Sequence, residues 1–213
     1  MIVLKRIVGI AVVFVVVTVA IALVSASSPA STPAPWPTLK ASATPDPADI
    51  AAIKTLVDNY FDITGEAAGT FDFSQFPTLF IDDPTVSLDN DQTVFITRIG
   101  AQATGFLSYE LAFFTDWKQG AEKLEKLQAQ LKAEKRAITV DDIKSISGPF
   151  GSPPSRRHEP VHKTRVTYNS FTIDGSRAIV EFDDVAVTQN MFFVKTKAGW
   201  RIAGQHNLQV HNV

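Results

Sequence analysis

Polar and apolar residues alternate along the last third of the chain, from Val161 to Val213. Period-two alternation is typical of strands that bury one face, and turn-forming pairs at Asp174-Gly175 and Ala198-Gly199 interrupt it. We therefore expect an antiparallel meander with one solvated face and one buried face. The buried positions predicted by this alternation are Val166, Tyr168, Ala178, Val180, Phe182, Trp200, Ile202, His206, Leu208 and Val210.

Two segments with helical spacing of apolar residues are available to cover the buried face of this sheet. The first, 47–64, has Asp46 as a candidate N-cap and is expected to end at Gly65. The second, 105–137, is aromatic in its first half and charged in its second half, which predicts a buried part and a solvated part. The expected fold class is α+β, with helices packed on a curved antiparallel sheet.

Shorter elements are predicted between these segments. Residues 71–81 are rich in phenylalanine and interrupted by Pro77, which indicates one or two short helical turns. A strand pair is expected at 86–88 and 93–99, and a further strand at 138–146.

The N-terminal segment is long and apolar enough to cross a membrane. Residues 7–24 carry no charge, and a helix of this length spans about 27 Å at 1.5 Å per residue. Lys5 and Arg6 precede the run and favour a cytoplasmic N-terminus with the remaining chain outside. We expect a single-pass protein of the cell membrane with an extracytoplasmic domain. The alternative is a signal peptide cleaved near Ala26, which would release a secreted domain.

The chain therefore divides into three regions. Residues 1–26 form the transmembrane anchor or signal peptide. Residues 27–46 are rich in proline, serine, threonine and alanine, a composition that is typical of an extended linker. Residues 47–213 form the α+β domain.

Composition excludes several classes of function. The formal net charge of −2 provides no basic field for a phosphate backbone, so we expect no nucleic-acid partner. The chain contains no cysteine, which excludes disulfides, thiol nucleophiles and thiolate metal sites. His158-Glu159-Pro160-Val161-His162 matches the zinc-protease pattern, but the internal proline opposes the helix that this pattern requires. We expect no metal site and no cofactor.

The order of helix, aromatic turn, acidic pair, helix and antiparallel sheet resembles the nuclear transport factor 2-like superfamily, including its SnoaL-like members. The segment Leu79–Pro84 (LFIDDP) looks like the acidic stretch of that superfamily, and Lys195–Ile202 (KTKAGWRI) looks like its final hairpin. The resemblance covers roughly 47–210 and implies a cystatin-like cone. The superfamily contains isomerases, dehydratases, cyclases, dimerisation modules and scaffolds, so the resemblance does not define a function.

In enzymes of this superfamily, a carboxylate or histidine inside the cone acts as a general base, which requires a pKa tuned by burial. The resemblance implies His206, Asp82 and Asp83 as catalytic candidates. Each also has a structural interpretation, as a hydrogen-bonded core histidine or as turn and cap residues. The residues expected to line a ligand pocket, or otherwise to belong to the core, are Tyr60, Tyr109, Trp117 and His206.

Two functions from different classes remain open, together with a third possibility, a purely structural module of a cell-envelope complex. The first is an exported, membrane-tethered, non-catalytic domain that binds a small apolar ligand or a protein partner, with a homodimer through the sheet as one form of partner. The second is a cofactor-free isomerase or dehydratase that uses a buried histidine or aspartate. Convergence of His206 with Asp82 or Asp83 on a shared vacant point would favour the enzyme, and a cone filled by phenylalanines would count against the enzyme.

Overall fold

The computed structural model describes residues 38–40, 44–146, 166–184 and 187–210. Contacts divide these residues into two units. The larger unit contains the described residues up to Asp116 and those from Val166 onward, and the smaller unit runs from Trp117 to Ile146. The apolar N-terminal segment, most of the linker and the zinc-protease pattern lie outside the described residues. None of the described helices combines the length and the apolar character needed to cross a membrane.

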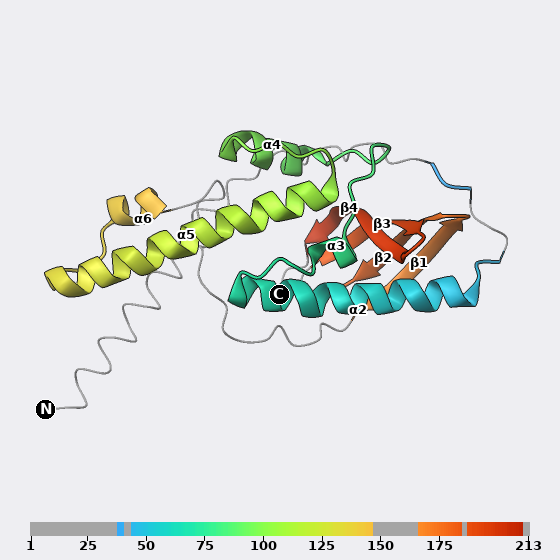
Figure 1. The fold of residues 1–213 in the computed structure, drawn as a ribbon, viewed down its shortest axis with the longest axis horizontal. Coiled ribbons are helices and arrows are strands. Elements are labelled where there is room, and N and C mark those ends of the chain that lie inside the picture. Colours follow the sequence, from blue (N-terminus) through green and yellow to red (C-terminus); the bar gives the residue numbers. More distant parts are fainter. Residues whose placement is uncertain (1–37, 41–43, 147–165, 185–186, 211–213) are drawn as a thin grey trace, which may run out of the picture. The chain divides into compact units, whose positions relative to one another are not determined.

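A four-stranded antiparallel sheet forms the C-terminal part of the larger unit (Figure 1). Its strands are β1 (Thr167–Asp174), β2 (Arg177–Asp183), β3 (Val187–Thr196) and β4 (Gly199–Val210), and they pair in the order β1-β2-β3-β4. Gly175 and Gly199 have positive φ angles of 58° and 103° at the two turns predicted from the sequence. The predicted meander and the α+β class are confirmed.

A β-bulge in β4 changes which residues face the core. Phe193 lies opposite Ile202, but the preceding residue, Phe192, lies opposite Gly204, so Ala203 is an extra residue on β4. The extra residue shifts the alternation by one position. Gln205 therefore shares the face of Ile202, and the prediction that alternation places His206 on that face is wrong.

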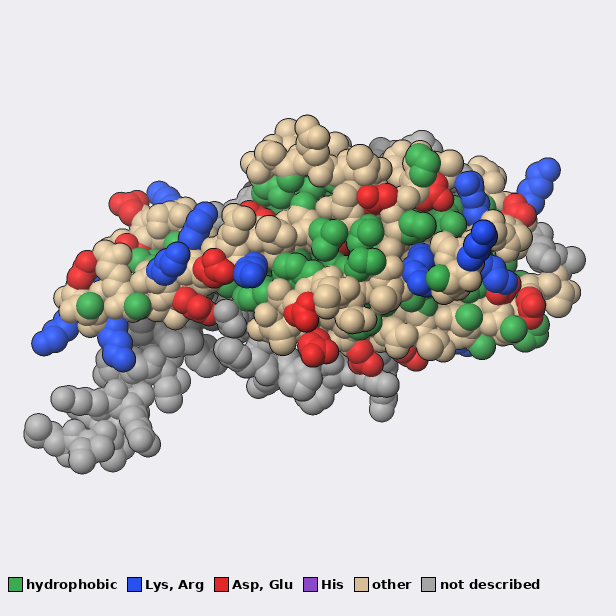
Figure 2. Space-filling view, in the orientation of Figure 1, with side chains coloured by type: hydrophobic (Ala, Val, Ile, Leu, Met, Phe, Trp, Pro, Cys, Tyr) green, Lys and Arg blue, Asp and Glu red, His purple; other side chains and the backbone are tan. Residues whose placement is uncertain are grey.

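Helix α2 (Pro47–Thr70) lies across one face of the sheet (Figure 1). Its predicted start is confirmed, because the Asp46 side chain accepts a hydrogen bond from the Ala48 backbone nitrogen at 2.8 Å. The predicted stop at Gly65 is wrong. Glycine inside a helix costs about 1 kcal/mol, and burial of Ala67 and Ala68 in the next turn continues the apolar face. Carboxylates cover the opposite side of α2 along its lower edge in Figure 2.

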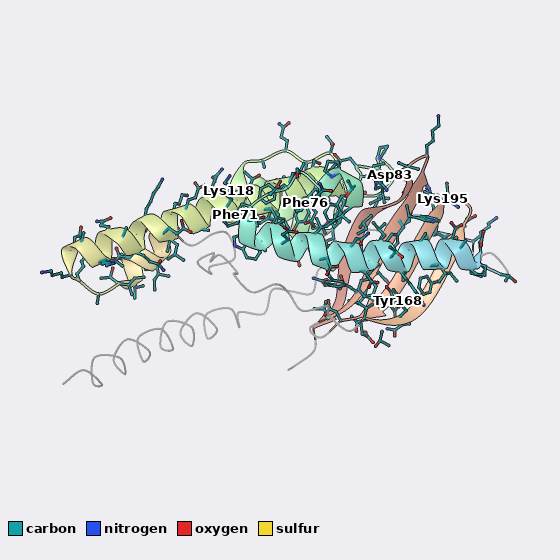
Figure 3. The ribbon with its side chains drawn as sticks, turned by 60° about the horizontal axis from the view of Figure 1, so that its bottom comes forward. Phe71, Phe76, Asp83, Lys118, Tyr168 and Lys195 are labelled. Carbon is teal, nitrogen blue, oxygen red and sulfur yellow. The ribbon has the colours of Figure 1, made fainter. Side chains whose placement is uncertain are left out.

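Helix α3 (Phe76–Leu79) is the short helical turn predicted in the aromatic segment. Helix α5 (Phe106–Glu134) is the predicted long helix, and only its first half belongs to the larger unit. Phe76 lies between α2 and this first half, with its ring centroid 5.0 Å from that of Phe114 (Figure 3). The core of the larger unit is filled by aromatic and aliphatic side chains, the largest of them Phe76, Phe80, Phe106, Phe182, Phe193, Met191 and Ile202.

Residues predicted as a strand at 93–99 form helix α4 (Asn90–Ile99) instead. A capping box determines this outcome: the Asp89 side chain accepts from the Gln92 backbone nitrogen at 2.7 Å, and the Gln92 side chain accepts from the Asp89 backbone nitrogen at 3.0 Å. These bonds satisfy backbone donors at the start of the helix, which offsets the low helix propensity of the β-branched residues at 93, 94 and 96. Residues 86–88, which were predicted as the partner strand, form neither a strand nor a helix.

The strand predicted at 138–146 is wrong as well, because helix α6 (Val140–Ile146) occupies this part of the smaller unit. The Asp142 carboxylate accepts from the Thr139 backbone nitrogen at 2.9 Å and caps the first turn. Arg136 donates to Asp142 at 2.5 Å and to Glu134 at 2.6 Å, which ties the end of α5 to the start of α6.

Candidate functional site

Asp82 caps the N-terminus of α5. Its carboxylate accepts from the Ser108 backbone nitrogen at 2.9 Å and from the Thr104 hydroxyl at 3.1 Å. A Cβ atom at Gly105 would lie 2.8 Å from the Cα and Cβ atoms of Asp82, so this approach requires glycine. Asp82 thus serves a local structural role in the described chain.

Asp83 is held in a turn of its own. Its carboxylate accepts from the Thr85 backbone nitrogen at 2.8 Å and from the Thr85 hydroxyl at 2.6 Å. This is an Asx turn, the alternative that the sequence allowed for this acidic residue.

His206 is buried on the opposite face of the sheet from Ile202 and lies across from Asn190 of β3. Burial lowers the pKa of His206, and the nearby Asp89 carboxylate partly opposes that effect. The described contacts place His206 opposite Asn190 and near Asp89, whereas Asp82 accepts hydrogen bonds at the start of α5 and Asp83 accepts them in a turn of its own.

Tyr60 and Tyr109, two of the four predicted ligand-lining residues, contact one continuous set of rings. Tyr60 meets Phe80 at 6.0 Å between centroids, Phe80 meets Phe106 at 5.5 Å, and Phe106 stacks with Tyr109 at 5.9 Å. Trp117 belongs to the smaller unit. The tyrosine pair thus lies where α2, α3 and the first half of α5 meet.

Glu110 is the functional candidate that the sequence interpretation missed. It lies one helical turn after Phe106 and one turn before Phe114, both of which are buried in the core. Its side chain is only 8% exposed, and burial raises its pKa to about 8 from an ordinary 4.5. The signal was present in the sequence, because positions 106, 110 and 114 share one helix face.

A chain of side-chain hydrogen bonds leads away from Tyr60 across the inner face of β4 and β3. The Tyr60 hydroxyl donates to Gln205 Oε1 at 3.4 Å, and Gln205 Nε2 donates to Gln189 Oε1 at 2.5 Å. Gln189, which is 1% exposed, donates through Nε2 to Asp184 Oδ2 at 2.7 Å. The bulge in β4 is what directs Gln205 into this chain.

The charged groups that act on the two tyrosines are all acidic. The pKa of Tyr60 is raised by burial and then by Glu110 and Asp184. The pKa of Tyr109 is raised by burial and then by Glu110, Asp89 and Asp91. The site therefore combines a buried acid, two tyrosines in their neutral form and a surrounding negative field.

The described residues offer no cluster of three or more histidine, cysteine, aspartate or glutamate side chains that would hold a metal ion. What the arrangement provides is hydrogen bonding and electrostatics. Comparisons with known protein families, with curated proteins and with solved structures gave no match. The resemblance to the nuclear transport factor 2-like superfamily remains a prediction from the sequence.

Proposed function

We propose that this chain is an exported, membrane-tethered domain that binds a small ligand between α2, α5 and the sheet rather than a catalyst. The observation that supports binding most directly is Glu110, an acid that is 8% exposed, acts electrostatically on Tyr60 and Tyr109 and forms no hydrogen bond with other described residues. Burial of an acid among core side chains costs free energy, and a ligand that hydrogen-bonds to the acid would offset part of that cost.

The finer architecture that goes with this proposal is a cone of the nuclear transport factor 2-like type. Three features support it: the order of α2, α3, α5 and the meander, the packing of these helices against one sheet face, and the acidic Asp82 at the start of α5. The tether is proposed from the sequence of residues 7–24 with Lys5 and Arg6 before it.

The use of Asp82 and Asp83 in local hydrogen bonds supports a non-catalytic role, and so does the position of His206 on the other sheet face. The phenylalanine-filled core points the same way. A second candidate, a cofactor-free isomerase or dehydratase, is favoured by one observation. The raised pKa of Glu110, about 8, keeps a proton on this acid at neutral pH, as general acid catalysis requires.

Native mass spectrometry of the full chain, purified from the membranes of its own host, tests the binding function. We expect the wild-type complex to release a small molecule on collisional activation, which leaves a protein of the mass expected from its sequence. We expect the Glu110→Gln variant to carry no such molecule. A wild-type chain that carries no small molecule would contradict ligand binding. A released molecule that the protein converts to an isomer or a dehydrated product would support the enzyme instead.

Topology is tested separately with alkaline phosphatase fused after Val213, because this reporter folds actively only outside the cytoplasm. We expect activity in the membrane fraction. An inactive fusion, together with activity of a cytoplasmic control reporter at the same position, would contradict export. Phosphatase activity in the medium would identify the cleaved, secreted form. Sedimentation of the purified full chain distinguishes a monomer from a homodimer through the sheet.

A further inference from the structure

One edge of the sheet is occupied by other parts of the described chain. Phe80 forms a parallel bridge with Ile202 of β4, and the Ile81 backbone nitrogen donates to the Ile202 carbonyl oxygen at 2.9 Å. Further along β4, the Gln92 side chain donates through Nε2 to the Gln205 carbonyl oxygen at 3.1 Å. The outer edge of β4 is therefore closed to another strand over this part of its length.

β1 forms the opposite edge of the sheet (Figure 1). Lys195 donates to the Ser176 carbonyl oxygen at 2.7 Å, so even-numbered residues of β2 bond to β3 and odd-numbered residues bond to β1. After the β1 bulge, even-numbered residues of β1 are the partners of these odd-numbered residues. The backbone N–H and C=O groups of Phe171 and Ile173 therefore point away from β2, and no described residue forms a hydrogen bond with them.

The composition of this edge permits pairing with its own copy. Residues 167–173 contain no charged side chain and no proline, two devices that keep edge strands of monomeric proteins from pairing. On the neighbouring helix α2, Lys54 Nζ lies 5.0 Å from the centroid of the Tyr168 ring, and Asp58 follows one helical turn later. Because these two charges cancel, this side of α2 does not repel a second copy.

The bulge near the start of β1 limits regular pairing to the residues that follow it. If the two-fold axis passes at Thr172, Phe171 lies opposite Ile173 of the second copy, and the two exchange backbone hydrogen bonds. Their side chains belong to the core-facing side of the sheet, so the apolar row continues into the second copy. Thr172 meets its own copy on the other face, and Asp174 lies opposite Ser170, so no like charges meet.

We propose that β1 pairs in antiparallel orientation with β1 of a second copy of this chain. The contact is isologous and uses the edge that the described sheet leaves free, so association stops at a closed dimer. The interface is short, and the proposed tether helps because two copies in one membrane have a high effective concentration. The inference specifies the homodimer edge and does not depend on ligand binding.

Disulfide cross-linking tests the register, because the chain has no cysteine of its own. Thr172→Cys should form a covalent dimer under mild oxidation of the full chain in detergent, since non-hydrogen-bonded opposite residues are about 4.5 Å apart between Cα atoms. Ser170→Cys is the matched control on the same face. Its copy would lie four residues away along the strand, about 13 Å, which is too far for a disulfide. Equal cross-linking of the two variants would overturn the register and with it the proposed pairing.

Charge reversal at the axis tests the interface without a covalent bond. The Thr172 side chain lies on the face opposite the main core, so Thr172→Lys should fold normally while placing two ammonium groups opposite each other. Sedimentation of the full chain in detergent should show a dimer whose dissociation constant rises at least about tenfold in Thr172→Lys and in Thr172→Glu. An equal mixture of the two variants should restore the dimer. The control Asn207→Lys, exposed on β4, should leave it unchanged.

The outcomes separate this interface from its alternatives and from the ligand-binding function. A wild-type chain that stays monomeric at micromolar concentration, or that carries an extended peptide of another protein on β1, would overturn pairing with a second copy. A dimer that Thr172→Lys leaves intact would assign self-association to another surface. Each of these results leaves the proposed small-molecule binding untouched, because native mass spectrometry tests that function on a monomer as well as on a dimer.

Discussion

Replacement of Glu110 by glutamine should stabilise the fold at neutral pH. The glutamate is 8% exposed between two core phenylalanines, and its pKa rises to about 8 in the folded chain from an ordinary 4.5. Below pH 4.5 the group is protonated in both the folded and unfolded states, so it adds no pH dependence. Between pH 4.5 and 8 the unfolded chain releases the proton while the folded chain retains it, and stability falls as pH rises.

The magnitude follows from the two pKa values. Each pH unit in this window costs about a factor of ten in the folding equilibrium, so the loss at pH 7 is on the order of 3 kcal/mol. Glutamine keeps the shape of the side chain and has no proton to release. The difference in unfolding free energy between Glu110→Gln and wild type should therefore be near zero at pH 4 and grow to a few kcal/mol at pH 7.

Urea unfolding of the purified chain, followed by tryptophan fluorescence at a series of pH values, measures this difference. Glu66→Gln is the matched control on the solvent side of α2, and its difference from wild type should stay flat across the same range. A difference for Glu110→Gln that does not grow with pH would refute the reasoning, because the carboxyl group would then be ionised and solvated in the folded chain.

Three further changes test the local structure. Gly105→Ala should cost about 1 to 3 kcal/mol in a urea titration, because the new Cβ would lie 2.8 Å from backbone and side-chain atoms of Asp82. Asp82→Ala should cost about 1 kcal/mol by removing the cap of α5, while Asp82→Asn retains an acceptor and most of the stability; equal losses for the two variants would exclude the cap. Asp89→Ala should speed amide hydrogen exchange in α4 more than in α2, because it removes the capping box with Gln92; uniform exchange would contradict this.

Much of the fold followed from the sequence because strong periodic patterns determine long elements. The meander, α2 and α5 bury continuous apolar faces, so their periodicity predicted them. The errors fall on short elements, where a few hydrogen bonds outweigh propensity. Thr93–Ile99 has the β-branched composition of a strand, yet the Asp89–Gln92 capping box begins a helix there. In α6, Asp142 has the same effect through its bonds to Thr139.

The sequence predicted the two tyrosines of the candidate site but not its buried acid. Tyr60 and Tyr109 were identified because aromatic residues at helical spacing mark a buried helix face, and the structure joins them through Phe80 and Phe106. Glu110 was passed over because a charged residue within an aromatic run is usually assigned to the solvated side. Its spacing of four from Phe106 places it on the buried side instead.

The bulge at Ala203 shows why the rest of the site required the structure. The extra residue in β4 exchanges the faces of the residues up to the next register shift, at Leu208, so Gln205 shares the face of Ile202 and His206 is buried on the opposite face. His206 then lies opposite Asn190 and near Asp89, whereas Gln205 completes a hydrogen-bond chain that ends at the Asp184 carboxylate. An inward histidine would have supplied a titratable base, whereas the inward glutamine fixes the polarity of Tyr60. A single inserted residue thus replaces a titratable base on this face by an amide that accepts the Tyr60 proton and continues the chain to Asp184.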